Sequence, residues 1–225
     1  MVSPKDSASL ILIRPCAITH GPSDYEVLVG RRTRANRFLP GIFAFPGGRL
    51  DRQDRRQSGF NETFQAPAES VDRETRYHFG AFVRAALRET HEETGLLIGR
   101  QSASASLPSP TGHWNAFWDR GLVPAFDAPR LVARAITPTG SPIRFHNRFL
   151  LCDGRLAHGA IGGSGELDEV DWVPLKDAMT LPMGEIGTLA LAQAVKHLEA
   201  VEPLPITRFS WKGPNFRPAF GQDGP

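Results

Sequence analysis

Apolar runs of strand length dominate the first fifty positions of the chain. Residues 9–18 (SLILIRPCAI) and 25–31 (YEVLVGR) are two such runs, and a Thr-His-Gly-Pro-Ser-Asp segment separates them. Two β-rich runs around a Gly-Pro turn predict a β-hairpin. Residues 38–48 (FLPGIFAFPGG) are apolar but interrupted by Pro and Gly, which predicts an irregular strand and a tight loop. Further strands are expected at 131–136, 144–152 and 169–173.

A helical period replaces the strand pattern after residue 78. Apolar residues then recur at steps of three and four until Gly95, which predicts an amphipathic helix with a glycine stop. The repeating positions are Phe79, Phe82, Val83, Ala86, Leu87 and Thr90. A last helix is expected over 184–200, and a short aromatic one over 113–122. Helices interleaved with strands favour an α/β layered fold.

The remaining segments indicate how the chain is organised. Residues 49–76 are polar and charged without a clear period, which is typical of an inserted loop. The tail, 201–225, holds five prolines and is expected to lack regular structure. We therefore expect one α/β domain over 1–200, with an insertion at about 52–76.

Composition narrows the class of protein. The charge is nearly balanced at +2, and 40% of the residues are hydrophobic, which excludes a polyelectrolyte arm and a disordered chain. No apolar run approaches the length of a membrane span, and no cationic leader precedes the first run, so a cytoplasmic location is expected. Cys16 and Cys152 lie in apolar runs and are expected to be buried, unpaired strand residues.

Three glutamates at helical spacing carry the main chemical signal. Glu89 lies three positions before Glu92 and four before Glu93, so the carboxylates share one helical face. Their mutual repulsion, near a helix C-terminus that disfavours anions, indicates a compensating cation. Mg²⁺ and Mn²⁺ take oxygen ligands of this kind. From the spacing alone, the alternative is a solvated acidic face with an ion pair between Arg88 and Glu92.

The surroundings of the glutamates resemble the Nudix box, G-x5-E-x7-R-E-U-x-E-E-x-G-U with U aliphatic, of the Nudix hydrolase family. Gly48, at the end of Phe-Pro-Gly-Gly, matches the first position, and residues 88–96 (RETHEETGL) match the second half. Asp54 stands in place of the first glutamate, and Thr90 in place of an aliphatic residue. The spacer over 55–87 has 33 residues instead of seven.

A similar insertion is a feature of a subgroup resembling peroxisomal coenzyme A diphosphatases, which residues 137–152 also resemble. The resemblance covers roughly residues 9–198 and implies an α/β/α sandwich with a mixed, curved sheet. The box helix would pack on one face, and the final helix would cover the same core.

The resemblance also implies a metal site. Glu89 and Glu93 would be the main ligands of Mg²⁺ or Mn²⁺, and Glu92 would be a further ligand or hold a water on the metal. The Gly48 carbonyl would complete the site, and Arg88 would orient the glutamates. The implied chemistry is the attack of water on a phosphorus of a diphosphate linkage, which divalent cations neutralise.

A carboxylate must take the proton of the attacking water, and in this family it lies on the helix or on a later loop. Glu166 and Glu169, in GELDEVDW, are the loop candidates. A solvated acidic turn before a strand is the alternative for both.

Four arginines fall within residues 31–37, without an acidic residue among them. Arg31, Arg34 and Arg37 are candidate substrate-binding residues, because guanidinium groups match phosphate oxygens. Arg31, Arg37 and Gly41 also partly match a coenzyme A diphosphatase pattern, from which Arg32 departs. The resemblance thus favours coenzyme A or acyl-coenzyme A, cleaved to 3′,5′-ADP and a phosphopantetheine. An ordinary basic surface loop is the alternative.

Two other functions stay open. One is a diphosphatase for ADP-ribose or another nucleotide sugar, and the other is a Nudix module that senses a nucleotide without cleaving it. The intact acidic cluster favours an enzyme. Because no DNA-reading element is visible, the expected partner is a small-molecule nucleotide, and neither nucleic acid nor a membrane.

An aromatic segment, residues 113–118, has two interpretations. Its side chains could stack on an adenine or line an acyl channel, or they could form core or homodimer contacts. They are His113, Trp114, Phe117 and Trp118. Other histidines lack the paired spacing of a zinc site and are treated as structural: His78, His91, His146 and His158.

Overall fold

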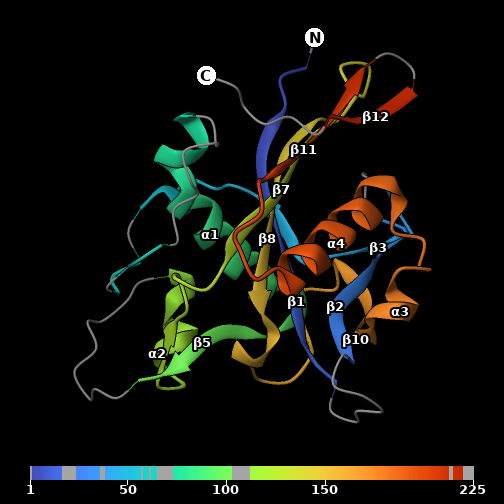
Figure 1. Cartoon of the computed structure of the whole chain (residues 1–225). Coiled ribbons are helices and arrows are strands. Elements are labelled where there is room, and N and C mark those ends of the chain that lie inside the picture. The colour runs from blue at the N-terminus through green and yellow to red at the C-terminus, as the bar shows by residue number, and fades with distance from the viewer. Residues whose placement is uncertain are drawn as a thin grey trace.

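A mixed sheet of nine strands forms the centre of the computed structural model (Figure 1). The structure describes residues 2–16, 24–35, 39–56, 58–60, 62–64, 73–102, 112–212 and 215–219. The strands are β1 (Lys5–Pro15), β2 (Tyr25–Arg32), β3 (Phe43–Ala44), β4 (Gly47–Arg49), β7 (Arg130–Ile136), β8 (Phe145–Asp153), β10 (Leu167–Pro174), β11 (Thr207–Lys212) and β12 (Asn215–Ala219). Their order is β10-β2-β1-β8-β7-β11-β12, with β3 paired to β2 and β4 paired to β1.

Strand β1 lies near the middle of this sheet and shows its mixed character. It pairs antiparallel with β2, so that Ile13 faces Val27, and parallel with β8 over nine residue pairs. The predicted hairpin is therefore confirmed, although its turn, residues 17–23, lies outside the described residues. The strands expected at 131–136, 144–152 and 169–173 correspond to β7, β8 and β10.

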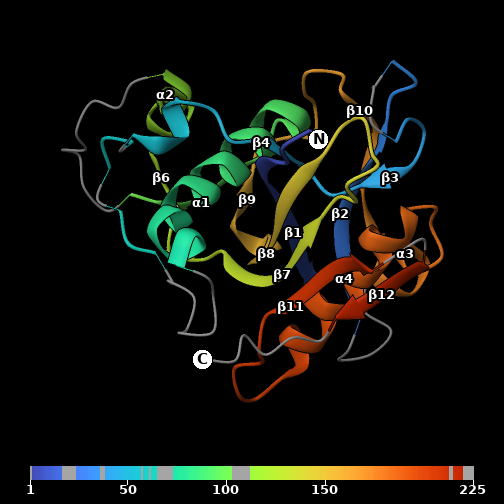
Figure 2. The ribbon, with the colours of Figure 1, turned by 90° about the horizontal axis from the view of Figure 1, so that it is seen from above.

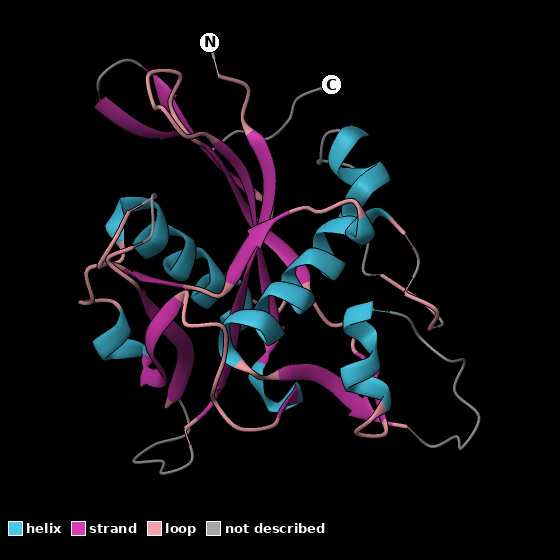
Figure 3. Cartoon of the chain, turned by 180° about the vertical axis from the view of Figure 1, so that it is seen from behind, coloured by secondary structure: helices cyan, strands magenta, loops and turns pink. Residues whose placement is uncertain are grey.

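Two long helices cover opposite faces of the sheet, α1 (Arg73–Thr94) and α4 (Gly184–Glu199), as Figures 2 and 3 show. Side chains alternate along β1, so Leu10 and Leu12 pack in the same cluster as α1, whereas Ile11 and Ile13 pack in the cluster of α4. The α/β/α sandwich is thus confirmed. The expectation that the final helix covers the same core is wrong, because the alternation of β1 creates two cores.

Short elements surround this frame. A second sheet of three strands has the order β6-β5-β9. Its strands β5 (Leu97–Gln101), β6 (Leu122–Pro124) and β9 (Ala157–His158) were not predicted, because runs of two to five residues carry little periodicity. The predicted aromatic helix is a 3₁₀ turn, η2 (Gly112–Trp114), followed by α2 (Asn115–Trp118). The other short helices are η1 (Gln53–Arg55), η3 (Gly154–Leu156) and α3 (Leu175–Ala178).

The C-terminal tail is more regular than its prolines suggested. Strand β11 runs parallel to β7 and continues into β12, which extends the sheet at one edge. The expectation of an irregular tail is therefore wrong. Pro218 lies in β12, the last strand of the sheet, where a residue without an N–H group is tolerated.

The two cysteines differ in burial, and both are free. Cys152 is buried within β8, as expected, and burial raises the pKa of its thiol to about 12. Cys16 is only partly buried, contrary to expectation, because β1 ends at Pro15 and Cys16 follows it. Among the described helices, none combines the length and the apolar character that crossing a membrane requires.

Candidate active site

The last two turns of α1 place the predicted glutamates against strand β4. Phe82, Val83 and Leu87 bury one face of this helix in the core. One turn later Glu93 is 6% exposed and Glu89 is half-buried. Their spacing of four residues puts both carboxylates on the same side of the helix, as the sequence predicted.

Two consecutive glycines of β4 allow the carboxylates to come this close. The Gly47 N–H donates a hydrogen bond of 2.8 Å to Oε2 of Glu93. A Cβ atom on Gly48 would lie 2.4 Å from the Glu89 carboxyl carbon, and one on Gly47 would lie 2.3 Å from the Ala8 carbonyl oxygen. Glu89 therefore lies against the side of Gly48 on which any other residue would carry its Cβ.

Ionisation of the half-buried Glu89 and the buried Glu93 is unfavourable in this environment. Burial raises the pKa of Glu89 to about 7, and the guanidinium of Arg88 opposes this shift. Burial also raises the pKa of Glu93 to about 8, with a further increase from the charge of Glu89 and a decrease from the Gly47 hydrogen bond. Near neutral pH the site therefore favours a proton or another positive charge between the two groups.

Arg88 lies at the centre of the carboxylate cluster and is 4% exposed. Its Nη1 donates to Oε1 of Glu89 and Oε2 of Glu92, both at 2.9 Å. Its Nε and Nη2 donate to the two oxygens of Asp54, at 3.0 and 2.9 Å. The predicted Arg88–Glu92 pair is present, and Asp54 balances the arginine from the other side. The long spacer thus leaves Asp54 in contact with the helix.

The first part of the insertion packs against α1 through a second arginine. Arg84 lies one turn before Arg88, and its Nε donates to the Asp54 carbonyl oxygen at 2.7 Å. Its Nη1 donates to Oε2 of Glu62 at 2.6 Å. Phe60, which is 7% exposed, belongs to the core cluster of α1. Asp54, Glu62 and Phe60 of the insertion therefore hold these two arginines of α1 in place through hydrogen bonds and packing.

Thr90, which departs from the aliphatic residue of the motif, is fully buried. Its hydroxyl donates to the Ala86 carbonyl oxygen at 2.7 Å within the same helix. The polar group is thus satisfied without a partner from another element, and the substitution leaves the packing of the helix intact.

The loop that leads into β10 closes the C-terminal end of α1. Gly162 and Ser164 donate their N–H groups to the carbonyl oxygens of Thr94 and Glu92, at 2.9 and 2.8 Å. A Cβ atom on Gly163 would lie 2.2 Å from the Glu93 carbonyl oxygen. These bonds satisfy carbonyls that a helix end leaves open, and they fix the loop beside the glutamates.

The two predicted loop glutamates lie in different places. The charge of Glu166 helps to raise the pKa of Glu93, so Glu166 is electrostatically coupled to the cluster. Glu169 has a φ of 49° at an irregularity of β10, and its carboxylate lies 3.2 Å from Nε of Arg31. The charge of Glu166 therefore acts on Glu93, whereas Glu169 is paired with Arg31.

The two predicted arginines that the structure describes have different surroundings. Arg31 stacks on Phe43, with its guanidinium carbon 4.8 Å from the ring centroid, and Arg34 lies in an exposed turn. Arg37 lies outside the described residues. Arg32, which was not a candidate, interacts electrostatically with Glu93 and Glu166. Strand alternation separates Arg31 from Arg32, and this periodicity could have identified Arg32 as the residue on the α1 side.

The aromatic segment mainly contributes to the core. Trp114 and Phe117 are 8% and 1% exposed, and their ring centroids lie 5.6 Å apart. Trp118 is 37% exposed. His113 has a different environment, since its Nδ1 lies 3.0 Å from Oε1 of Glu92. No local pattern in the sequence indicated this contact.

A crystal structure of a NUDIX hydrolase from Alicyclobacillus acidocaldarius matches this architecture with a TM-score of 0.66. Its sequence is 30% identical, and the match covers 87% of this chain and 93% of that one. The chain belongs to the Nudix hydrolase family. It is therefore an enzyme of a class that acts on phosphorus-containing anhydrides.

Other Nudix structures, with lower sequence identity, also align with this chain. The NUDIX domain of Shewanella oneidensis NrtR, crystallised with ADP-ribose, is 14% identical with a TM-score of 0.47, over 88% of this chain and 90% of that one. A C. elegans Ap4A hydrolase is 16% identical with a TM-score of 0.44, over 86% and 97%. No protein-family profile and no curated protein matches the sequence.

Nudix hydrolases generally use divalent metal ions, and the donor groups of this site fit such an ion. Glu89 and Glu93 are oxygen donors whose pKa values burial raises, so a positive charge beside them would be favourable, and the absence of a Cβ on Gly48 makes room for the Glu89 carboxylate. Over the described part of the chain, no three His, Cys, Asp or Glu side chains are gathered as a ready metal site. Glu92 is instead bonded to Arg88 and His113.

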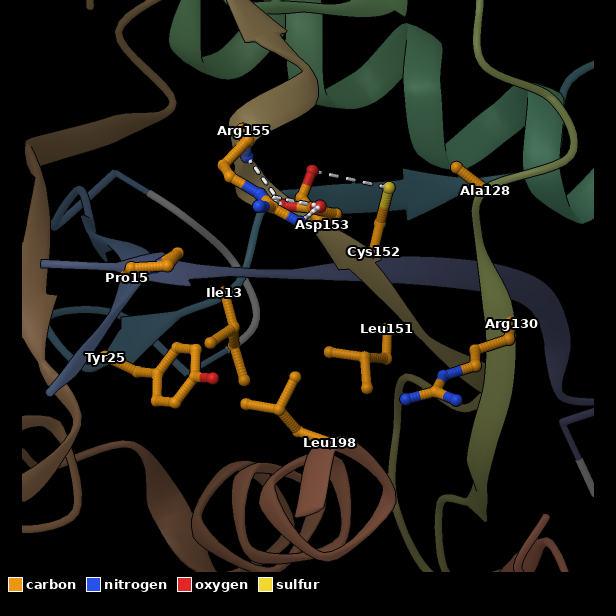
Figure 4. Close-up of a pocket in the computed structure, with 10 residues that line it drawn as sticks. All are labelled: Ile13, Pro15, Tyr25, Ala128, Arg130, Leu151, Cys152, Asp153, Arg155 and Leu198. Carbon is orange, nitrogen blue, oxygen red and sulfur yellow. Dashed lines mark hydrogen bonds and ion pairs between the residues drawn. The ribbon is translucent and has the colours of Figure 1, made fainter. Parts of the chain in front are cut away.

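A cavity of about 350 Å³ lies near the end of β1 (Figure 4). It is lined by Ile13, Pro15, Tyr25, Ala128, Arg130, Leu151, Cys152, Asp153, Arg155 and Leu198. None of the predicted site residues is among these ten, and the carboxylates predicted to bind the metal lie beside β4 instead.

Proposed function

We propose that this Nudix hydrolase cleaves a diphosphate linkage in a nucleoside diphosphate derivative with Mg²⁺ or Mn²⁺. The observation that carries the proposal is the contact of Gly47 and Gly48 with two buried carboxylates, Glu89 and Glu93. Two neighbouring carboxylates whose pKa values burial raises suit a divalent cation.

Glu89, Glu93 and the Gly48 carbonyl would hold the cation, and Glu92 would assist them. When bound, such a cation neutralises diphosphate oxygens and lowers the pKa of water. Arg88 keeps Glu89 and Glu92 oriented through its two bonds of 2.9 Å. Asp54 offsets the charge of Arg88, so that the glutamates remain available for the cation.

We assign the acceptance of the water proton to the carboxylate of Glu166 in preference to Glu169. Glu166 is coupled to Glu93, whereas Glu169 is engaged with Arg31. A carboxylate can act as the base when it lies within reach of the attacking water. Glu166→Gln is expected to lower kcat by about 10²-fold or more, and Glu169→Gln to leave it close to the wild-type value.

Coenzyme A or an acyl-coenzyme A is the leading substrate, with 3′,5′-ADP and a phosphopantetheine as products. Support comes from the arginines around the turn after β2, of which Arg31 is 43% exposed at its side chain and Arg34 is exposed. Together with Arg37 they would bind the phosphates of the substrate. ADP-ribose or another nucleotide sugar is the second candidate, because the carboxylate cluster does not specify the group beyond the diphosphate.

A substrate panel with Mg²⁺ or Mn²⁺, with products identified by mass, tests the proposal. Coenzyme A should be cleaved, and 3′-dephospho-coenzyme A should be cleaved with a lower kcat/KM. Glu93→Gln should lower kcat by about 10²-fold or more, and Glu199→Gln, at an exposed glutamate of α4, serves as the matched control. Tight nucleotide binding without product from any substrate would support the sensing module instead.

A further inference from the structure

Each carboxylate oxygen of Glu92 lies close to a side-chain nitrogen. Arg88 donates a hydrogen bond from Nη1 to Oε2 at 2.9 Å, and Nδ1 of His113 lies 3.0 Å from Oε1. The main-chain oxygen of Glu92 also accepts a hydrogen bond, from the N–H of Ser164 at 2.8 Å. The residue is thus held by its own helix, by the loop before β10 and by the segment before α2.

Because the side chain of Glu92 is partly exposed, the contact with His113 helps to fix its conformation. The side chain of Glu92 is 35% exposed, whereas Glu93 is 6% exposed and enclosed by its surroundings. A long, partly exposed side chain samples several rotamers unless specific bonds fix it. Arg88 restrains one oxygen, and His113 restrains the other. Each carboxylate oxygen has two acceptor sites, so Oε1 can accept from His113 and still contact a cation.

His113 is itself firmly placed. The next residue, Trp114, is 8% exposed and packs with its ring centroid 5.2 Å from that of Phe126. Phe117, one helical turn further, is 1% exposed. These anchors fix the start of α2 against the core of α1. The imidazole is therefore presented to Glu92 by a rigid element, as effective support of a metal ligand requires.

We propose that His113 is a positioning residue, which donates its Nδ1–H to Glu92 and thereby orients this carboxylate for the divalent cation. The inference rests on the proposed function, since it needs a cation at the glutamates. No proton is transferred in this role, because the imidazole acts only as a fixed hydrogen-bond donor. An asparagine amide nitrogen occupies nearly the place of Nδ1, whereas the amide of glutamine lies one bond further out.

The test compares His113→Ala, His113→Asn and His113→Gln with Asn115→Ala, an exposed neighbour in the same segment. Mn²⁺ dissociation constants are measured by electron paramagnetic resonance of free Mn²⁺, and kcat and KM are measured on the best substrate. We expect Mn²⁺ binding about tenfold weaker for the Ala and Gln variants, and near wild type for the Asn and Asn115→Ala variants. At subsaturating Mn²⁺, kcat should fall while KM changes little.

A double variant shows whether His113 acts through Glu92. With Glu92→Ala as the background, His113→Ala should weaken Mn²⁺ binding no further. A full additional loss in that background, or an Asn variant as weak as the Ala variant, overturns the inference. Wild-type binding of Mn²⁺ by all three His113 variants also overturns it, and leaves the proposed function intact. A wild-type protein that binds no Mn²⁺ overturns the proposed function and the inference together.

Discussion

Asp54 forms two hydrogen bonds to Arg88 across 34 positions of sequence, and both side chains are almost completely buried. The pair spans an insertion that separates the two halves of the Nudix motif. Its geometry explains why a shorter acid can stand where the motif has glutamate, since Asp54 reaches both Nε and Nη2 of Arg88.

Removal of one partner of this pair should destabilise the fold. Asp54→Ala leaves a buried guanidinium without its main counter-charge, so we expect the free energy of unfolding to fall by about 3–5 kcal/mol. Urea denaturation measures it, and Gln53→Ala, an exposed neighbour in η1, is the control. Equal unfolding midpoints for wild type and Asp54→Ala would contradict the role given to Asp54.

Glu93→Gln should separate activity from stability. The variant loses a proposed cation ligand, so kcat should fall by about 10²-fold or more. The amide oxygen can still accept the Gly47 N–H, and the buried negative charge is gone. The metal-free variant should therefore melt above the metal-free wild type near pH 8, by differential scanning calorimetry. A lower melting temperature would show that the ionised carboxylate stabilises the fold.

The pH dependence of the metal-free protein follows from the same groups. Glu89 and Glu93 have pKa values of about 7 and about 8 in the fold, above the 4.5 of a free glutamate. Between pH 4.5 and the pKa values of about 7 and about 8, the folded state binds more protons than the unfolded state, so the free energy of unfolding decreases as the pH rises. This contribution is complete below 4.5 and is lost as the pH passes 7 and 8.

Melting temperatures in EDTA across this range measure the effect. Glu93→Gln should show a shallower decline than wild type, because one of the two titrating groups is absent. Saturating Mg²⁺ or Mn²⁺ should flatten the wild-type curve by supplying positive charge. Identical slopes for wild type and Glu93→Gln would exclude Glu93 as a source of the pH dependence.

Gly48→Ala should impair the site without unfolding the protein. The new Cβ would lie 2.4 Å from the Glu89 carboxyl carbon, so that side chain must move. A displacement of about 1 Å at a catalytic group can lower turnover by about 10²-fold, and we expect a loss of that order in kcat/KM. Gly140→Ala is the control, because no atom lies within 4 Å of a Cβ at that position. Full activity of Gly48→Ala would remove Gly48 from the site.

Local patterns predicted the parts of the fold and site that local spacing encodes. Helix α1 and the Arg88–Glu92 pair follow from steps of three and four residues, and the main strands follow from their apolar runs. Contacts between segments that are distant in sequence could not be predicted from local spacing. The His113–Glu92 contact joins two elements through tertiary packing, and β11 forms because β7 offers it a partner despite the surrounding prolines. The side of the sheet that Arg32 faces could have been found from strand alternation alone.

The N–H groups of Gly162 and Ser164 bond to the final turn of α1, and the same loop carries Glu166. The loop with the proposed proton acceptor is therefore hydrogen-bonded to the helix with the proposed cation ligands, although the two segments lie about seventy residues apart in the chain. Because Ser164 is bonded to the carbonyl oxygen of Glu92, any shift of this loop on binding would also displace the backbone that carries the glutamates.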